Sequence, residues 1–158
     1  MNPTFCNPTQ GRTVALVGDI YRFLVTGEET NGKYAICEAI VSPGGGPPPH
    51  VHRREEEGFF ILEGQIVFQI GPEQIVATAG MFANMPVGTE HSFKNLSGKP
   101  AKMLVLVAPA GIEQMFFEVG VPLAQGATSA PLPTKEEIEK LPAIARKYGV
   151  EIRIPQQG

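Results

Sequence analysis

Histidine, cysteine and clustered basic residues are all scarce in this chain of 158 residues, which has three histidines and two cysteines. Its 13 lysines and arginines are scattered, and the formal net charge is −3. A surface that follows a phosphate backbone needs concentrated positive charge, so we expect no nucleic-acid partner. No apolar run approaches the roughly 20 residues that cross a bilayer, so we expect no membrane partner.

The two cysteines, Cys6 and Cys37, are too few for a disulfide framework and lack the CxxC spacing. Two reduced thiols in a cytoplasmic protein are the simpler interpretation, and one disulfide between them is the alternative. Residues 1–11 contain neither the basic start nor the apolar stretch of a secretion signal. We therefore expect a cytoplasmic location.

Glycine and proline, in contrast, are abundant: 18 glycines and 15 prolines make up about a fifth of the chain, against a usual share of roughly an eighth. So many helix breakers disfavour a helical bundle and favour short strands joined by turns. The mass of 17.0 kDa is typical of one domain with one core, and 42% apolar residues can fill it.

Short strand-like segments recur through the first two thirds of the chain, at a spacing of roughly eight to twelve residues. Residues 26–32 and the Gly-Pro run 42–49 interrupt them as a turn and an irregular segment. This pattern predicts an all-β sandwich or barrel. The expected strands are 14–17, 21–25, 34–41, 59–62, 65–70, 74–78, 81–84, 91–95 and 103–107.

The last third of the chain has a different character. Residues 113–119 suit a short helix or an extended segment, and Met115–Phe117 is expected in the core, with a pocket-lining lid as the alternative. Residues 123–133 are rich in proline, glycine, alanine and serine and indicate a connection.

A helix is expected to follow this connection. Thr134 and Glu137 have the spacing of a capping box, which opens a helix that should end at Gly149. Pro142 lies inside it and should kink or split it near Leu141.

The histidines have spacings suited to a metal site. His50 and His52 would point the same way on a strand, and a polar turn after them could bring Glu57 back beside the pair. Two nitrogens and a carboxylate suit a borderline divalent metal, and His91, after another turn, could supply a fourth ligand. Taken alone, however, His-x-His is more often a surface feature, and Glu55–Glu57 is more often a solvated turn.

Two motifs together resemble the cupin family over about a third of the chain. The first has the order glycine, His-x-His, glutamate and glycine, and the second has glycine, Pro-x-Gly, histidine and asparagine. All the family's spacings are kept in Gly44, His50, His52, Glu57 and Gly64, and in Gly80, Pro86, Gly88, His91 and Asn95.

The resemblance implies an all-β fold, an antiparallel jelly-roll (cupin) barrel with the metal in its mouth. We expect this barrel over residues 1–120, with the motifs at 44–64 and 80–95. Residues 121–158 would form a linker and a short C-terminal helical extension that packs on the barrel or on a partner. The family also implies a homodimer.

By carry-over from the family, the metal ligands are His50, His52, Glu57 and His91. The four-residue gap selects Glu57 rather than Glu56, and Asn95 is expected to be structural. These four ligands would leave two positions open on an octahedral ion, which could be Fe, Mn, Ni, Co, Cu or Zn.

The reaction is indicated less directly than the site. Glu57 is the expected catalytic base, and strand alternation places Phe59 and Ile61 on its side and Phe93 on the side of His91. These side chains would make the cavity apolar and favour an aromatic or otherwise apolar small-molecule substrate.

The general style of the sequence resembles small quercetinase-like cupins, which implies a metal-dependent dioxygenase. The alternatives are a non-catalytic cupin that binds a metal or small ligand, and an isomerase or lyase that uses the ion as a Lewis acid.

Overall fold

The computed structural model describes residues 1–153, which form three antiparallel sheets and three helices. The first sheet has seven strands, in the spatial order β11 (Val121–Leu123), β1 (Thr13–Leu16), β2 (Asp19–Val25), β3 (Ala35–Val41), β10 (Ala101–Ala108), β5 (Glu56–Glu63) and β8 (Phe82–Met85). The others are β12 (Val150–Ile152) with β4 (His50–His52), and β7 (Glu73–Thr78) with β6 (Gln65–Ile70) and β9 (Ser92–Lys94). The helices are α1 (Gly27–Thr30), α2 (Glu113–Val119) and α3 (Lys135–Lys147).

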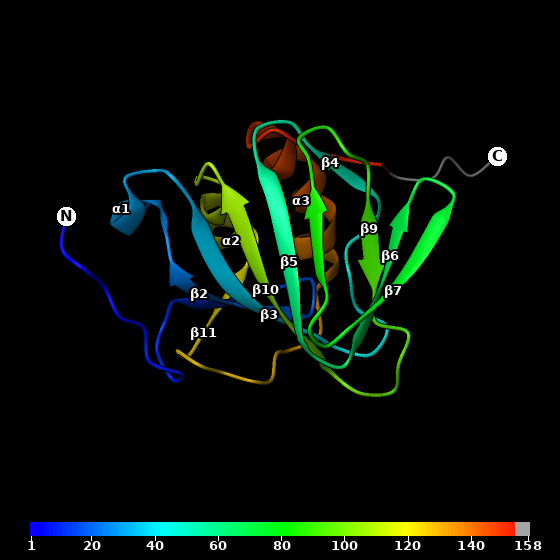
Figure 1. Ribbon diagram of the computed structural model, residues 1–158, viewed down its shortest axis with the longest axis horizontal. Coiled ribbons are helices and arrows are strands. Elements are labelled where there is room, and N and C mark those ends of the chain that lie inside the picture. The colour runs from blue at the N-terminus through cyan, green and yellow to red at the C-terminus, as the bar shows by residue number, and fades with distance from the viewer. Residues whose placement is uncertain (154–158) are drawn as a thin grey trace.

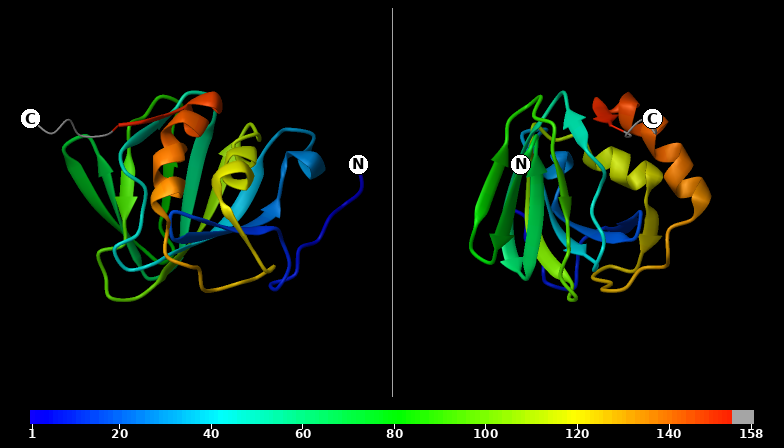
Figure 2. Two further views of the ribbon diagram at one scale, coloured as in Figure 1. Left: turned by 180° about the vertical axis from the view of Figure 1, so that it is seen from behind. Right: turned by 90° about the vertical axis from the view of Figure 1, so that its right-hand side faces the viewer.

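The two smaller sheets together face the seven-stranded sheet across the core (Figure 1). An isolated antiparallel bridge between His50 and His91 joins them, so β4 and the start of β9 lie next to each other. Helices α2 and α3 lie together on the side of the molecule away from β6 and β7 (Figure 2). This architecture confirms the predicted antiparallel jelly-roll barrel with a C-terminal helix.

Alternation along β5 shows why these residues form a half-buried strand. Phe59 and Ile61 are each 1% exposed and point into the barrel, whereas Phe60 between them is 39% exposed. From β6, Ile66 and Phe68 are buried opposite them. Burying each such side chain stabilises the fold by about 1.5–3 kcal/mol.

The Gly-Pro segment before β4 is held against the barrel by close backbone contacts. Gly46 has φ +124°, and a Cβ there would overlap the carbonyl of Phe93 on β9. The buried Asp19 carboxylate accepts hydrogen bonds from the backbone N–H of Ser42 (3.3 Å) and of Gly46 (3.0 Å). Glycine is therefore required where this loop passes β9 and delivers the chain to His50.

Helix α3 differs from its prediction in two ways. Thr134 Oγ1 accepts from the Glu137 N–H at 3.1 Å, but Glu137 does not complete the capping box, because its carboxylate accepts instead from the Val17 N–H at 2.7 Å. The helix also runs unbroken through Pro142, so of the two expected outcomes near Leu141, a kink or a split, the split is wrong. Packing of its inner face against the core keeps the helix continuous despite the missing proline N–H.

Two helices and two strands lie in segments where the sequence did not predict them or allowed an alternative. The turn 26–32 contains α1, and residues 113–119 are helical rather than extended. Strands β11 and β12 were not expected inside 121–158, where β11 pairs with β1 and β12 pairs with β4. Each has three residues, which is too short for a recognisable alternation.

Both cysteines are free in the structure, so the alternative of a disulfide is not realised. Among the described residues, each helix is too short or too polar to traverse a bilayer.

Candidate metal centre

Backbone hydrogen bonds place the three histidines next to one another. His50 and His91 exchange N–H···O bonds of 3.0 and 3.1 Å, and the Gly88 N–H donates to the carbonyl of His52 at 2.9 Å. The polar residues after His52 turn the chain so that Glu57, the second residue of β5, lies beside them. The turn expected from the sequence therefore brings the carboxylate to the histidine pair.

The four predicted ligands converge on one point. One ligand atom from each of them lies within 4.8 Å of every other, and all four residues are buried. Glu57 Oε1 is 2.8 Å from His52 Nε2 and 3.1 Å from His91 Nε2.

Two of the rings are oriented by backbone carbonyls. Nδ1 of His50 is 2.9 Å from the carbonyl oxygen of Pro48, and Nδ1 of His91 is 3.0 Å from that of Thr89. A carbonyl oxygen only accepts, so each Nδ1 carries the proton and donates it. The lone pair of each Nε2 is then free to bind a cation.

This arrangement fits a divalent transition ion. Two ligand atoms about 2.1 Å from an ion and at right angles to each other are about 3 Å apart, close to the contacts of Glu57 Oε1. Within residues 1–153, buried Glu57 Oε1 and His91 Nε2 make no aligned hydrogen bond. Buried polar atoms without partners are costly, and a cation between them would satisfy both.

The electrostatics of the site favour positive charge at its centre. Burial lowers the pKa of His50 to about 4, which keeps this ring neutral. Burial also lowers the pKa of His52, but the Glu55 and Glu57 carboxylates outweigh it and raise that pKa to about 9. For Glu57, burial raises the pKa, but His52 and His91 outweigh it, so the pKa is lowered and the group is ionised.

The cluster opens into an apolar cavity of about 90 Å³. A second cavity of about 220 Å³ adjoins it, since the two share lining residues from β1, β2, the Gly-Pro loop, α3 and β12. Within the described chain, the residues that line these cavities include no lysine or arginine. The shared residues are Leu16, Tyr21, Pro47, Pro48, Leu141 and Ile152.

The structure brings two of the three expected pocket residues to the inner cavity. Phe59 and Phe93 line it, whereas Ile61 is buried deeper in the core and is not part of its wall. Ile61 follows Phe59 by two residues along β5, so it points inward but lies one step farther from the mouth. Met115 and Phe116 both pack against the core and line the cavity, so the two alternatives for this segment coexist.

Sequence reasoning missed the contribution of the C-terminal segment to this wall. Leu141 and Ala145 of α3 line the inner cavity, and so do Val150 and Ile152 of β12. The i, i+4 spacing of the two helix residues was the available signal, since it places them on one face. The strand residues gave no comparable signal.

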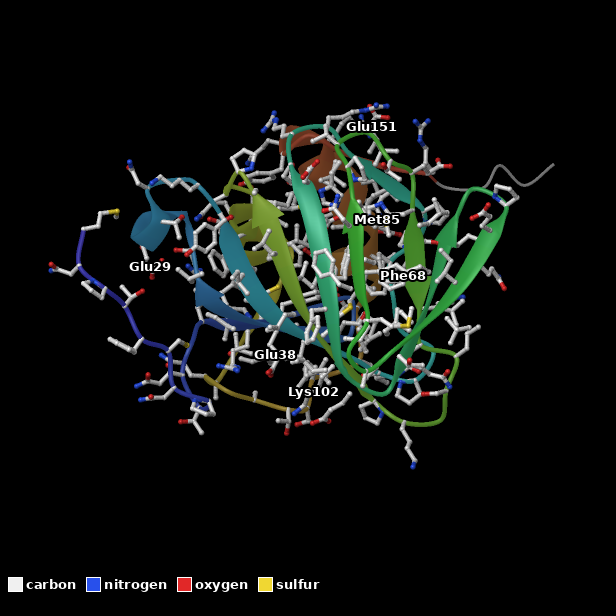
Figure 3. The ribbon with its side chains drawn as sticks, in the orientation of Figure 1. Glu29, Glu38, Phe68, Met85, Lys102 and Glu151 are labelled. Atoms are coloured by element: carbon white, nitrogen blue, oxygen red, sulfur yellow. The ribbon has the colours of Figure 1, made fainter. Side chains whose placement is uncertain are left out.

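Strand β12 is paired directly with the strand that carries two ligands. Val150 lies opposite His52 and Ile152 lies opposite His50. Between them, Glu151 receives two hydrogen bonds from the Arg53 guanidinium, at 3.1 and 3.2 Å. Figure 3 shows Glu151 at the end of the molecule where β4 turns into β5.

Known proteins resemble the chain in sequence and in fold. Residues 37–107 match the family model described as "Cupin domain". Quercetin 2,3-dioxygenase of Bacillus subtilis is 26% identical over 112 residues, which are 71% of this chain and 31% of the dioxygenase. The chain thus spans about a third of the length of that curated relative.

Solved structures share the fold at low sequence identity. A predicted oxalate decarboxylase from Thermotoga maritima superimposes with a TM-score of 0.61 at 19% identity, covering 68% of this chain and 99% of its own. The polyketide cyclase RemF from Streptomyces resistomycificus gives 0.59 at 22% identity, covering 68% and 79%. These similarities show the fold.

Proposed function

Residues 37–107 form a cupin domain, and from this premise we propose that the protein binds one divalent transition-metal ion and oxidises a small apolar substrate. His50, His52, Glu57 and His91 would hold the ion. The observation that carries the proposal is the cavity without cationic side chains, which is lined by three of these residues, His50, His52 and Glu57.

The cavity lining favours apolar substrates over substrates that carry negative charge. A sugar phosphate or a dicarboxylate brings negative charges that a cavity normally binds with lysine or arginine. Here the wall is built from aliphatic and aromatic side chains, such as Phe59, Phe93 and Phe116. An aromatic or otherwise apolar molecule with one or two oxygen atoms that reach the ion fits this lining.

Cavity size adds a limit on the substrate. An apolar cavity of about 150 Å³ holds benzene, and the inner cavity is smaller, about 90 Å³. We therefore expect a substrate with a ring to extend into the adjoining cavity of about 220 Å³, which shares Tyr21 and Leu141 with the inner one.

A quercetinase-like dioxygenase is the finer form of the proposal, supported by the 26% identity to quercetin 2,3-dioxygenase. When bound, a redox-active ion would supply Lewis acidity and electron transfer. Glu57 lines the cavity, so its carboxylate is placed to accept the proton of a substrate hydroxyl group. The apolar walls exclude water from the reacting atoms.

The first experiment tests metal binding. We expect elemental analysis of protein purified without added metal to find about one transition ion per chain, and His50→Ala with His91→Ala to lose it. The double variant Lys135→Ala with Glu139→Ala, on the exposed face of α3, is the matched control. Equal metal content in the histidine variant and the parent would refute the ligand set.

The second experiment tests the reaction. Oxygen uptake is measured with flavonols and catechols on the Fe, Mn, Ni and Co forms, in the parent and in Ala145→Phe. Ala145 is fully buried at the cavity wall, so the larger side chain should block the substrate and leave the metal content unchanged. A metal-loaded protein that consumes no oxygen with any substrate would contradict the dioxygenase and leave a binding protein or a redox-neutral enzyme.

A further inference from the structure

A second buried carboxylate lies behind the four-residue cluster. Glu55 is 3% exposed, although it belongs to a run of three glutamates in a turn, where side chains are normally solvated. Its neighbour Glu56 is exposed. Burying a carboxylate in such a turn is costly unless a charged or hydrogen-bonding partner compensates.

The partner is the outer nitrogen of His52. Glu55 Oε1 lies 3.4 Å from His52 Nδ1, on the side of the ring opposite Nε2, which faces Glu57. The contact is not aligned as a hydrogen bond, but within residues 1–153 His52 Nδ1 has no other hydrogen-bond partner, so no other group in this part of the chain competes with Glu55 for it.

This contact distinguishes His52 from the other two histidines. The Nδ1 atoms of His50 and His91 are hydrogen-bonded to backbone carbonyls, whereas Nδ1 of His52 faces the Glu55 carboxylate. A carboxylate that receives the outer N–H of a ligating histidine fixes the tautomer, orients the ring and makes its inner nitrogen a stronger donor.

We propose that Glu55 is a positioning residue of the metal centre, which acts on the ion through His52. Glu55 does not touch the ion. It holds the His52 ring with Nε2 toward Glu57, and its negative charge, added to that of Glu57, matches the two positive charges of a divalent ion in a buried site. This inference rests on the proposed metal binding.

The test compares Glu55→Gln with Glu56→Gln, which removes the same charge one residue away from an exposed side chain. Zn²⁺ affinity is measured by competition with a chelator, and the imidazole N–H resonances of the Zn²⁺-loaded protein are recorded by NMR. For Glu55→Gln we expect affinity to fall about 10- to 100-fold, the range for lost carboxylate partners of ligating histidines. The His52 Nδ1–H resonance should shift, while those of His50 and His91 stay in place.

Glu56→Gln should change neither the affinity nor the resonances. Unfolding of the metal-free variants shows whether they fold. If Glu55→Gln does not fold, Glu55→Asp provides the test, because it keeps the negative charge but places it one carbon farther from His52. Only the His52 Nδ1–H resonance should then shift.

Unchanged Zn²⁺ affinity and an unchanged His52 resonance in Glu55→Gln, or equal effects of Glu55→Gln and Glu56→Gln, would overturn the role of Glu55 and leave the metal site intact. A parent protein that binds no divalent ion would instead overturn the proposed function, and this inference with it.

Discussion

Asp19→Asn tests how the loop that leads to the metal ligands is held. Asp19 is 4% exposed, and burial raises the pKa of its carboxyl from 3.8 to about 6, although hydrogen bonds from the Ser42 and Gly46 backbones lower it. The folded protein thus binds this proton more tightly than the unfolded chain does. The contribution of Asp19 to stability is therefore greatest below about pH 4 and is lost as the pH rises through about 6.

The pKa of Asp19 is 3.8 in the unfolded chain and about 6 in the folded protein. Ionisation of this carboxyl between pH 4 and pH 7 therefore lowers the free energy of unfolding by about 3 kcal/mol. Asparagine has no charge, so the variant avoids this loss. Its amide offers one acceptor oxygen to two backbone donors, so one N–H loses its partner at a cost of about 1–3 kcal/mol. We expect Asp19→Asn to be less stable than the parent at pH 4 and equally or more stable at pH 7.

Urea denaturation of the metal-free protein at several pH values between 4 and 7.5 measures this difference. The control Glu73→Gln removes an exposed carboxylate at the β6–β7 turn and should show no such change. A stability difference between Asp19→Asn and the parent that stays constant from pH 4 to pH 7.5 would refute the buried, proton-binding carboxyl.

Three further predictions concern folding and assembly. Asn95 is 0% exposed, and its side-chain amide donates to two backbone carbonyls and accepts from the Ser97 N–H. We expect Asn95→Ala to lower the free energy of unfolding, measured by urea denaturation, by about 2–3 kcal/mol. A decrease of less than about 0.5 kcal/mol would contradict this role. Gly46→Ala should abolish zinc binding, because the added Cβ would overlap the carbonyl of Phe93 on β9. Gly44→Ala adds its Cβ in open space, so it should cost only about 1 kcal/mol of stability through backbone strain and should leave zinc binding intact. Equal effects of the two on zinc affinity would argue against that steric reason. The homodimer stays a prediction, supported by the neighbouring aromatic residues Phe60 and Phe82, which are 39% and 63% exposed. Analytical ultracentrifugation should find that the parent is a dimer and that Phe82→Ser weakens its association. A parent protein that sediments as a monomer would contradict the homodimer.

Much of the site could be predicted because its information is local. His50 and His52 share a face by strand geometry alone, and the polar turn after them returns the chain to Glu57. His91 was assigned through the spacing of the second motif, and the structure places it in a backbone bridge with His50. The role proposed here for Glu55 gave no sequence signal, because a run of three glutamates does not reveal which one is buried.

Errors arose where long-range packing overrode a local rule. Pro142 was expected to kink or split its helix, and the split does not occur because contacts of α3 with the core keep the helix continuous. Glu137 should complete a capping box, but Val17, 120 residues earlier in the chain, offers an N–H that its carboxylate takes instead. A local rule states what a segment prefers in isolation, and tertiary contacts of comparable energy can reverse that preference.

Alternation and turn residues predicted an all-β fold and most strands of the barrel, because both are properties of neighbouring residues. The four converging residues were implied by two motifs whose spacings resemble those of the cupin family. The surroundings of these four residues depend on how the whole chain packs. This packing brought β12 beside β4, made α3 a wall of the cavity, moved Ile61 out of that wall and buried Glu55 against His52. The positions of β12 and α3 depend on packing between segments far apart in the sequence, which no local pattern encodes.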